Sequence, residues 1–472
     1  MVSDSAEQST SEVDLLARFE QRGIVAARDR RGDGALMRRN QCIVRWTDVD
    51  GGVEAVKREL ERARLYQRPR DDKADDGTRI IGRLLQFTVP SRRDATIAPV
   101  DEIAAAIETL AEVGIRATPN YVYFGAAEFT GHPLYTGSPL YAGSPLYAGS
   151  PLYAGSPLYA GSGELRSSAR PTLDAPPFPE IASTRKGGST PKVLVLDTGL
   201  KTVVDADGVR WAAHDELREH CIIHQREDEE WRIDGDPNVI DDEDEEDSNA
   251  NGHLDVQSGH GTFIAGIVAR LCPEAEIHVD GVLSSFGDGD DVSIGDGLRR
   301  AIGRLGGEQF DVVVMSLGAY TVDDEPPPLA DTIAELVGPE TLVVAAAGNA
   351  GSPRLCWPAA LPDVVAVGAL DSPGRAWFSN YGGWVDACAP GVDVRSTFFS
   401  GVNDPVDDTP TMFNEFVGWA TWNGTSFTAP KVAAVIAADM VRNGGSSRGS
   451  WRRLSGYQHF RYPDLGVVFN VL

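Results

Sequence analysis

The sequence predicts an α/β protein: a doubly wound, largely parallel sheet over residues 191–472, preceded by a small α+β domain of ferredoxin-like order. Two observations predict this organisation. Beyond residue 190, continuous apolar segments of strand length alternate with helical segments, as expected for parallel strands buried on both faces. Before residue 126, strand-like and amphipathic helical segments alternate on a smaller scale.

The first 125 residues contain two kinds of sequence. Residues 1–35 are charged and lack steady periodicity, so we expect a flexible arm. Residues 36–125 are periodic and predict the α+β domain. In chain order, the expected elements are a strand at 41–46, a helix at 53–67, a strand at 83–89, a helix at 101–113 and a strand at 121–124.

Residues 126–190 are rich in Pro, Ser and Gly and predict a linker, because few apolar positions recur. Within it, residues 131–162 carry near-identical copies of the unit GSPLYA. Three interpretations stay open: a spacer, tandem self-cleavage sites at each Leu-Tyr, or an array of short peptides that is itself the product.

Composition excludes several function classes. The net charge is −27 and most of the acidity lies in residues 191–472, which argues against nucleic-acid binding. No run of about 18 apolar residues predicts a membrane span. The N-terminus does not resemble a signal peptide, so we expect a cytoplasmic protein. The five widely spaced cysteines are expected to be buried free thiols.

Three residues of the C-terminal segment carry the side chains that serine nucleophiles need. Asp197 ends the strand-like stretch VLVLD, His260 begins an apolar helical stretch, and Ser426 lies at the start of another. A serine hydroxyl needs a base to take its proton and a buried acid to orient that base. Asn349 follows a further buried strand, where its amide could donate to an oxyanion.

Seven short stretches, in order, resemble the signatures of the subtilisin-like serine protease (subtilase) family: LDTG, GHGTFIAG, MSLG, AAAGN, SNYG, APG and GTSFTAP. The resemblance covers roughly residues 191–442 and implies a subtilisin-like fold. It implies that Asp197 orients His260, that His260 is the general base and then acid, and that Ser426 is the nucleophile. Asn349 would form the oxyanion hole together with the Ser426 backbone N–H.

The same resemblance implies the substrate contacts. Ser316, Leu317 and Gly318 resemble the strand that pairs with extended substrate, and Gly348 resembles a wall of the primary pocket. Cys356 is expected at the base of that pocket, where its side chain would favour a medium apolar residue. Subtilases are commonly made with a small α+β propeptide that then occupies the cleft, and residues 36–125 resemble one.

One insertion departs from the family. Seven consecutive acidic residues at 241–247 predict a solvated run. Its end places Gly252 at the turn of an EF-hand-like calcium loop, but Ser258 stands where the bidentate Glu belongs. The candidate ligands for a structural calcium ion are Asp247, Asn249, Asn251 and Asp255. A simple charged loop is the alternative, and no cofactor is expected for catalysis.

Together these features predict a serine endopeptidase that acts on protein or peptide substrates. We expect its N-terminal domain to regulate it as an intramolecular partner, with self-processing in the linker. Two alternatives stay open: a dedicated peptide-maturation protease acting on the Leu-Tyr repeats or a partner precursor, and a protease-like scaffold whose cleft is permanently plugged.

Overall fold

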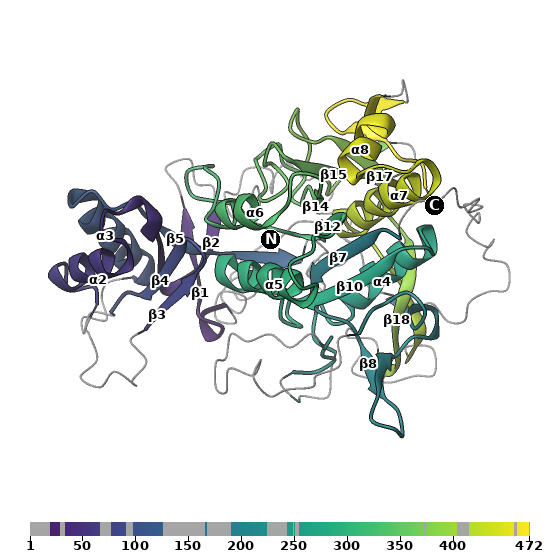
Figure 1. Cartoon of the computed structure of the whole chain (residues 1–472), viewed down its shortest axis with the longest axis horizontal. Helices are drawn as coiled ribbons and strands as arrows, with labels where there is room; N and C mark the ends of the chain where they lie inside the picture. The colour runs from purple at the N-terminus through teal and green to yellow at the C-terminus, as the bar shows by residue number, and fades with distance from the viewer. Residues whose placement is uncertain are drawn as a thin grey trace, which may run out of the picture. The chain divides into compact units, whose positions relative to one another are not determined.

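The computed structural model describes residues 19–28, 34–66, 77–90, 98–125, 166–167, 190–223, 243–248, 250, 254–371, 374–403, 415–456 and 460–471 (Figure 1). These residues form two compact units. The first unit contains the described residues up to Val122 together with Asp290–Gly295 and Tyr320–Glu335. The second contains the described residues of Tyr123–Gly289, Asp296–Ala319 and Leu336–Leu472. The hexapeptide repeats lie outside the described residues.

The described residues between 19 and 125 form an antiparallel sheet with the helices α2 and α3. Their elements are β1 (Ile24–Arg28), β2 (Gly34–Arg45), η1 (Trp46–Asp48), α2 (Gly52–Arg62), β3 (Thr78–Ile81), β4 (Leu84–Thr88), α3 (Pro99–Glu112) and β5 (Ala117–Gly125). The strand order is β5-β2-β4-β3, with β1 beside β2. This is the ferredoxin-like order, so the predicted fold of the domain is confirmed.

Two local predictions for this domain need correction. The arm predicted for residues 1–35 is wrong in its last part, because β1 pairs with the first half of β2. The strand β3 was not predicted at all. Both strands are short apolar segments beside charged residues, and pairing with a neighbour rather than local periodicity makes them strands.

The second unit is built on a largely parallel sheet, which confirms the predicted α/β class. Its strands are β7 (Lys192–Asp197), β10 (Glu276–Gly281), β12 (Val312–Met315), β14 (Leu342–Ala346), β15 (Val364–Asp371), β16 (Gly374–Arg375), β17 (Ala387–Pro390), β20 (Arg461–Tyr462) and β21 (Gly466–Val468). The order is β10-β7-β12-β14-β15-β17-β21-β20, and all pairs from β10 to β21 are parallel (Figure 1). Only β16 and β20 pair antiparallel.

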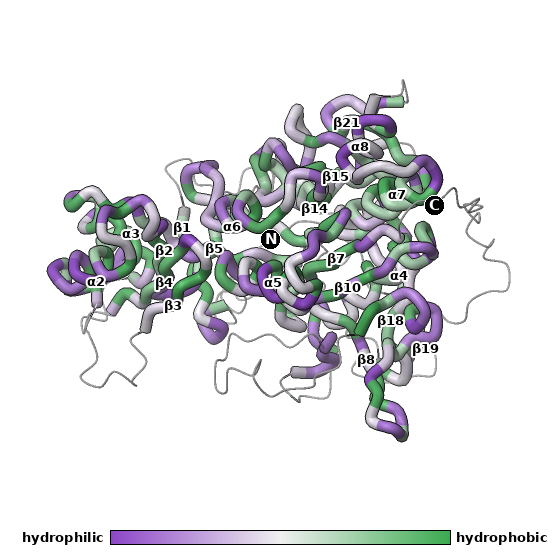
Figure 2. Tube along the Cα trace, viewed as in Figure 1, coloured by the Kyte–Doolittle hydropathy of each residue, from purple (hydrophilic) through white to green (hydrophobic). Residues whose placement is uncertain are grey.

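Two helices, α4 (His260–Leu271) and α7 (Thr428–Asn443), pack against each other and against this sheet. Alternate residues of β7, such as Val193 and Val195, join Val432 and Ile436 of α7 in one buried cluster. Figure 2 shows the corresponding hydrophobic colour along β7. This packing holds the carboxyl ends of the strands, where α/β proteins place their sites, in fixed register with both helices.

The remaining elements are β6 (Arg166–Ser167), β8 (Thr202–Val204), β9 (Arg210–Ala212), η3 (Asp215–Leu217), β11 (Asp288–Asp290), α5 (Asp291–Arg304), β13 (Leu317–Gly318), α6 (Leu329–Leu336), β18 (Val394–Asn403), β19 (Glu415–Trp422), η5 (Thr425–Phe427) and α8 (Ser447–Gly456). The strands β18, β19 and β6 form a small antiparallel sheet, and β8 pairs with β9.

All five cysteines are buried free thiols, as predicted. Burial raises the pKa of each thiol to about 12, so they remain protonated at neutral pH.

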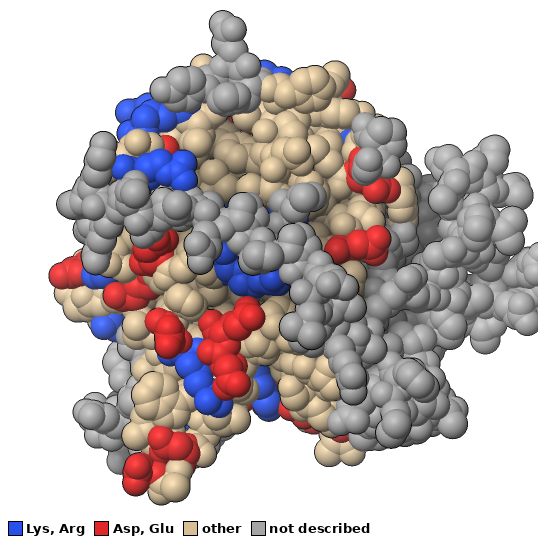
Figure 3. Space-filling model, turned by 90° about the vertical axis from the view of Figure 1, so that its right-hand side faces the viewer, with Lys and Arg blue, Asp and Glu red and all other residues tan. Residues whose placement is uncertain are grey.

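Among the described residues, no helix has the length and apolar character needed to cross a membrane. On the face shown in Figure 3, acidic and basic side chains of the described residues are interspersed.

Candidate active site

Asp197 and His260 form a buried hydrogen-bonded pair. Asp197 is the last residue of β7 and His260 the first residue of α4, and His260 Nδ1 lies 2.6 Å from Asp197 Oδ1. Both side chains are fully buried. The carboxylate therefore holds the proton on Nδ1, which leaves Nε2 as the acceptor. Nε2 is buried and makes no hydrogen bond within the described part of the chain.

A glycine lets the helix approach the strand this closely. A Cβ atom on Gly261 would lie 2.1 Å from the carbonyl oxygen of Gly199, a distance that no side chain tolerates. The Gly261 N–H instead donates to Thr198 Oγ1 at 2.9 Å. The Thr198 N–H in turn donates to Asp197 Oδ1 at 2.8 Å. The glycine of the HGT stretch thus sets the spacing between the acid and the base.

Asp244 supports this helix from the acidic insertion. Its Oδ1 accepts a hydrogen bond from the Gly259 N–H at 2.9 Å. Its Oδ2 accepts one from the Thr262 N–H at 3.2 Å and one from Thr262 Oγ1 at 2.8 Å. Gly259 immediately precedes α4 and Thr262 lies in its first turn, where backbone N–H groups have no partner within the helix. Asp244 is therefore an N-terminal cap of the helix that carries His260.

The prediction of a solvated run at 241–247 is wrong for this residue. Asp244 is fully buried, and burial raises its pKa to about 7, with a further increase from the nearby Asp197 charge. Its neighbour Glu243 is also hydrogen-bonded, because its Oε1 accepts a hydrogen bond from the Thr202 N–H at 3.1 Å. Seven clustered acidic residues suggest solvation, but the donors that meet Asp244 lie 15 to 18 residues further along the chain. No local signal in the sequence indicates them.

Ser426 lies in η5, directly before α7, and is buried. Its Oγ donates a long hydrogen bond of 3.5 Å to the Ser316 carbonyl oxygen. Ser316 Oγ donates to the Ser426 carbonyl oxygen at 2.7 Å. The next residue, Phe427, packs beside His260 with ring centroids 5.5 Å apart. The structure therefore brings Ser426, Ser316 and His260 into one site, with the Ser426 hydroxyl turned toward Ser316.

Asn349 follows β14, and its amide has a defined orientation. Its Oδ1 accepts hydrogen bonds from the Thr425 N–H and from Thr425 Oγ1, both at 2.8 Å. Two donors on one atom identify it as the oxygen, so the other atom is the NH₂ group. Nδ2 is buried and has no hydrogen-bond partner among the described residues. A buried donor without a partner is costly in a folded protein and is typical of a functional site.

The residues predicted to bind substrate lie next to this centre. Leu317 and Gly318 form β13, which pairs antiparallel with the end of β5. Cys356 lies between Gly318 of the predicted substrate-pairing strand and Gly348, the predicted wall of the primary pocket. Its Sγ is 2.5 Å from the position that a Cβ of Gly318 would take and 3.1 Å from the corresponding position of Gly348.

The described residues give little support to the predicted calcium loop. Asn249 and Asn251 lie outside them. Asp255 is buried, and its Oδ2 accepts hydrogen bonds from Ser248 N at 2.8 Å, Ser248 Oγ at 2.6 Å and Ser285 Oγ at 2.7 Å. Among the described residues, no group of three or more His, Cys, Asp or Glu side chains could hold a metal ion. Calcium binding, including any role for Asp247, stays a prediction.

Sequence comparison identifies relatives of this chain. The model of the subtilase family matches residues 188–454. The M-protease of Shouchella clausii (strain KSM-K16) is 31% identical over 294 residues, which are 59% of this chain and 60% of the relative. Subtilisin Savinase of Lederbergia lenta is 31% identical over 288 residues, which are 58% of this chain and 83% of the relative. The chain therefore spans less than two thirds of the M-protease.

A solved cold-adapted subtilisin-like serine proteinase is also similar, at 22% identity and a TM-score of 0.40, covering 60% of this chain and 88% of its own. The family match covers more than half of the chain and includes every motif of the candidate site. These sequence matches show that the chain belongs to the subtilase family.

Proposed function

We propose that the chain is a serine endopeptidase in which Asp197, His260 and Ser426 act as a catalytic triad. The observation that carries this proposal is the buried 2.6 Å hydrogen bond between His260 Nδ1 and Asp197 Oδ1. It fixes the imidazole so that Nε2, which has no hydrogen-bond partner among the described residues, can accept a proton.

The proposed reaction uses side chains of this protein, the Ser426 backbone N–H and water. Ser426 Oγ rotates from the Ser316 carbonyl toward His260 and attacks the carbonyl carbon of the substrate, while its proton passes to Nε2. His260 then donates this proton to the leaving amine as the peptide bond breaks. Water attacks the resulting acyl-enzyme through the same base, which releases the acid product and restores Ser426.

Asn349 is proposed to stabilise the tetrahedral intermediate. Its Oδ1 is fixed by Thr425, so Nδ2 can donate to the negatively charged oxygen, together with the Ser426 backbone N–H. A donor that is oriented before the reaction needs no reorganisation as charge develops.

We further propose that the N-terminal domain inhibits this site. The last residues of β5, Phe124 and Gly125, pair antiparallel with Gly318 and Leu317. On the other side, the Gly125 N–H donates to the Gly287 carbonyl oxygen at 3.0 Å. An extended segment with strand neighbours on both sides is how a peptide is bound by strand addition. This supports a role for residues 123–125 as an internal substrate mimic.

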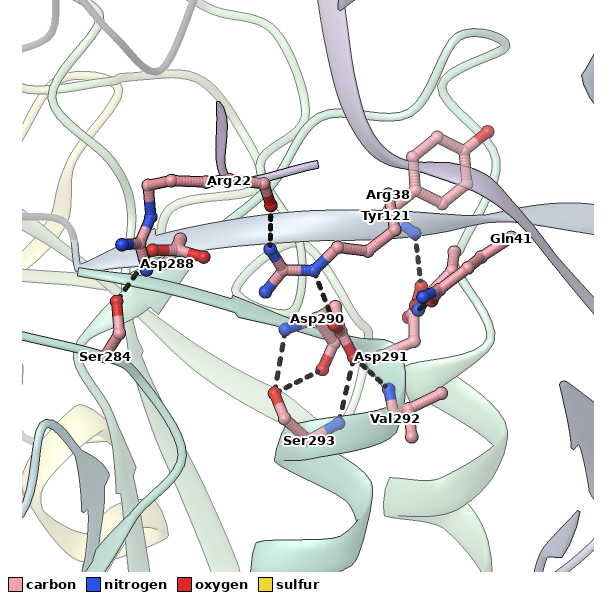
Figure 4. Close-up of polar contacts among 11 residues, drawn as sticks. Arg22, Arg38, Gln41, Tyr121, Ser284, Asp288, Asp290, Asp291, Val292 and Ser293 are labelled. Atoms are coloured by element: carbon pink, nitrogen blue, oxygen red, sulfur yellow. Dashed lines mark hydrogen bonds and ion pairs between the residues drawn. The ribbon is translucent and has the colours of Figure 1, made fainter. Parts of the chain in front are cut away.

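Within the first unit, side chains and backbone groups of the N-terminal domain contact residues 290–292, and these contacts support a stable position of the domain (Figure 4). Arg38 of β2 donates from Nε to Asp290 Oδ2 at 2.7 Å, and both side chains are largely buried. The Tyr121 N–H of β5 donates to Asp291 Oδ2 at 2.8 Å. Ile43, Ile81 and Leu84 pack with Val292 in one apolar cluster. Such attachment would keep the end of β5 in place until the chain is cut.

Labelling with a serine-directed fluorophosphonate tests the proposal, with Ser426→Ala as the control. We expect covalent labelling of the wild-type chain only, together with serine-dependent hydrolysis of a peptide. A permanently plugged scaffold, which the position of Gly125 beside Leu317 would favour, predicts neither label nor hydrolysis. A dedicated maturation protease would cleave after Leu-Tyr within residues 131–162.

The cytoplasmic location also stays a prediction.

A further inference from the structure

The subsite next to the catalytic histidine is closed by one buried side chain. A Cβ atom on Gly125 would lie 3.0 Å from Gln257 Oε1 and 3.5 Å from His260 Cε1. A methyl group there would have to push the amide away by a few tenths of an ångström. A branched or aromatic side chain would meet both Gln257 and the imidazole.

Gln257 has little freedom to move aside. It is 1% exposed, and a Cβ on Gly287, which has φ +84°, would lie 2.4 Å from its Cγ. Its backbone is held on both sides, since its N–H donates to the Ser285 carbonyl at 2.9 Å and its carbonyl accepts from the His260 N–H at 3.1 Å. The side chain therefore fills the space between the two glycines and the catalytic histidine.

The strand register assigns this subsite to a position in a bound peptide. In the antiparallel pairing, Phe124 faces Gly318 and Gly125 faces Leu317. A peptide that continues this register would place its next residue opposite Ser316, whose carbonyl oxygen contacts Ser426 Oγ. That next residue would present its carbonyl carbon to the nucleophile. Gly125 thus occupies the position of the residue that precedes the cleaved one.

We propose that this peptidase selects substrates with glycine at the second residue before the cut, and that Gln257 enforces the selection. The proposal rests on the proposed function, because it assumes that residues 123–125 occupy the site as a substrate would. The sequence Phe124-Gly125-Ala126 meets this requirement for a cut after Ala126. A cut after Tyr141 in the repeats does not, because Leu140 would enter the closed subsite.

Three fluorogenic peptides test the proposal on the full chain: Tyr-Phe-X-Ala linked to an aminocoumarin, with X as Gly, Ala or Val. Active sites are counted by fluorophosphonate labelling. We expect kcat/KM to fall about 10-fold from Gly to Ala and at least about 100-fold from Gly to Val, because a displaced imidazole loses its catalytic geometry. Gln257→Ala should reduce the Gly-to-Ala ratio to about 2-fold or less.

Two further variants keep the test decisive. Gln257→Asn retains the amide but shortens the side chain, so it should also reduce the ratio if Gln257→Ala fails to fold. Gln309→Ala removes an exposed glutamine elsewhere in the same unit and should leave the ratio unchanged. Equal cleavage of the three peptides by wild type, or a ratio unchanged in both Gln257 variants, would overturn the proposal. Absence of both labelling and hydrolysis would instead overturn the peptidase function, and the subsite proposal with it.

Discussion

Asn349 Oδ1 accepts two hydrogen bonds from Thr425, the residue that precedes Ser426. Thr425 Oγ1 also accepts from the Gly348 N–H at 3.1 Å. The short helix η5, which carries the proposed nucleophile, therefore hydrogen-bonds directly to the amide proposed to stabilise the oxyanion. This relationship couples the orientation of the donor to the position of Ser426.

Asn349→Ala should lower kcat by about 10²- to 10³-fold with little change in KM, because the lost hydrogen bond forms only in the transition state. Thr425→Val keeps the shape of the side chain but removes the hydroxyl, so it should lower kcat by about 10-fold through a looser Asn349 amide. Steady-state kinetics with a glycine-containing peptide measure both effects. An unchanged kcat in Asn349→Ala would remove this residue from the proposed mechanism.

Asp244 should make stability depend on pH. Burial raises the pKa of Asp244 to about 7 in the folded protein, above the ordinary aspartate value of 3.8. Between these values the folded state binds more protons than the unfolded state, so the free energy of unfolding falls as the pH rises from about 4 to about 7. The contribution is complete below this range and lost above it.

Urea unfolding at about pH 5 and about pH 7.5, in a Ser426→Ala background, measures this effect. Asp244→Asn removes the titrating group, so the difference between the two midpoints should be smaller than in the parent. Glu245→Gln, a change at the exposed neighbouring acid, should leave that difference as it is. An equal pH dependence in the parent and Asp244→Asn would contradict the assignment.

Weakening the Arg38–Asp290 pair should activate the full-length chain. Arg38→Glu places two like charges in a largely buried site, where breaking an ion pair costs about 3–5 kcal/mol. We expect a several-fold higher initial rate of peptide hydrolysis. Arg62→Glu is the matched control, because Arg62 is exposed and pairs with Glu59 of its own helix. If the Arg38→Glu chain had the wild-type rate, attachment through this pair would not limit activity.

Cys356→Gly should widen the primary pocket, because Sγ lies against the Cβ positions of both Gly318 and Gly348. In peptides of the form Tyr-Phe-Gly-X, we expect kcat/KM for X = Phe to rise relative to X = Ala by about 10-fold, on the scale of a few buried methylene groups. Cys388→Ala, at a buried cysteine in β17, is the control. No shift in preference would place Cys356 outside the pocket.

Local patterns were sufficient to predict part of this architecture. The parallel strands are buried on both faces and so appear as continuous apolar runs, and the four proposed catalytic residues each lie in a short glycine-containing motif. Asp244 and Gln257 could not be predicted in this way. Asp244 acts on an N–H group 15 residues away, and Gln257 acquires its role by packing against Gly125 and Gly287. Such contacts arise from the tertiary fold and leave no local periodicity.

Intact-mass analysis of the purified chain over time, beside Ser426→Ala, tests the central claim most directly. We predict that the wild-type chain converts into two fragments with the first cut after Ala126, and that Ser426→Ala stays at full length. A wild-type chain that stays intact and takes no fluorophosphonate label, or a Ser426→Ala chain cut at the same rate, would contradict a self-processing serine peptidase.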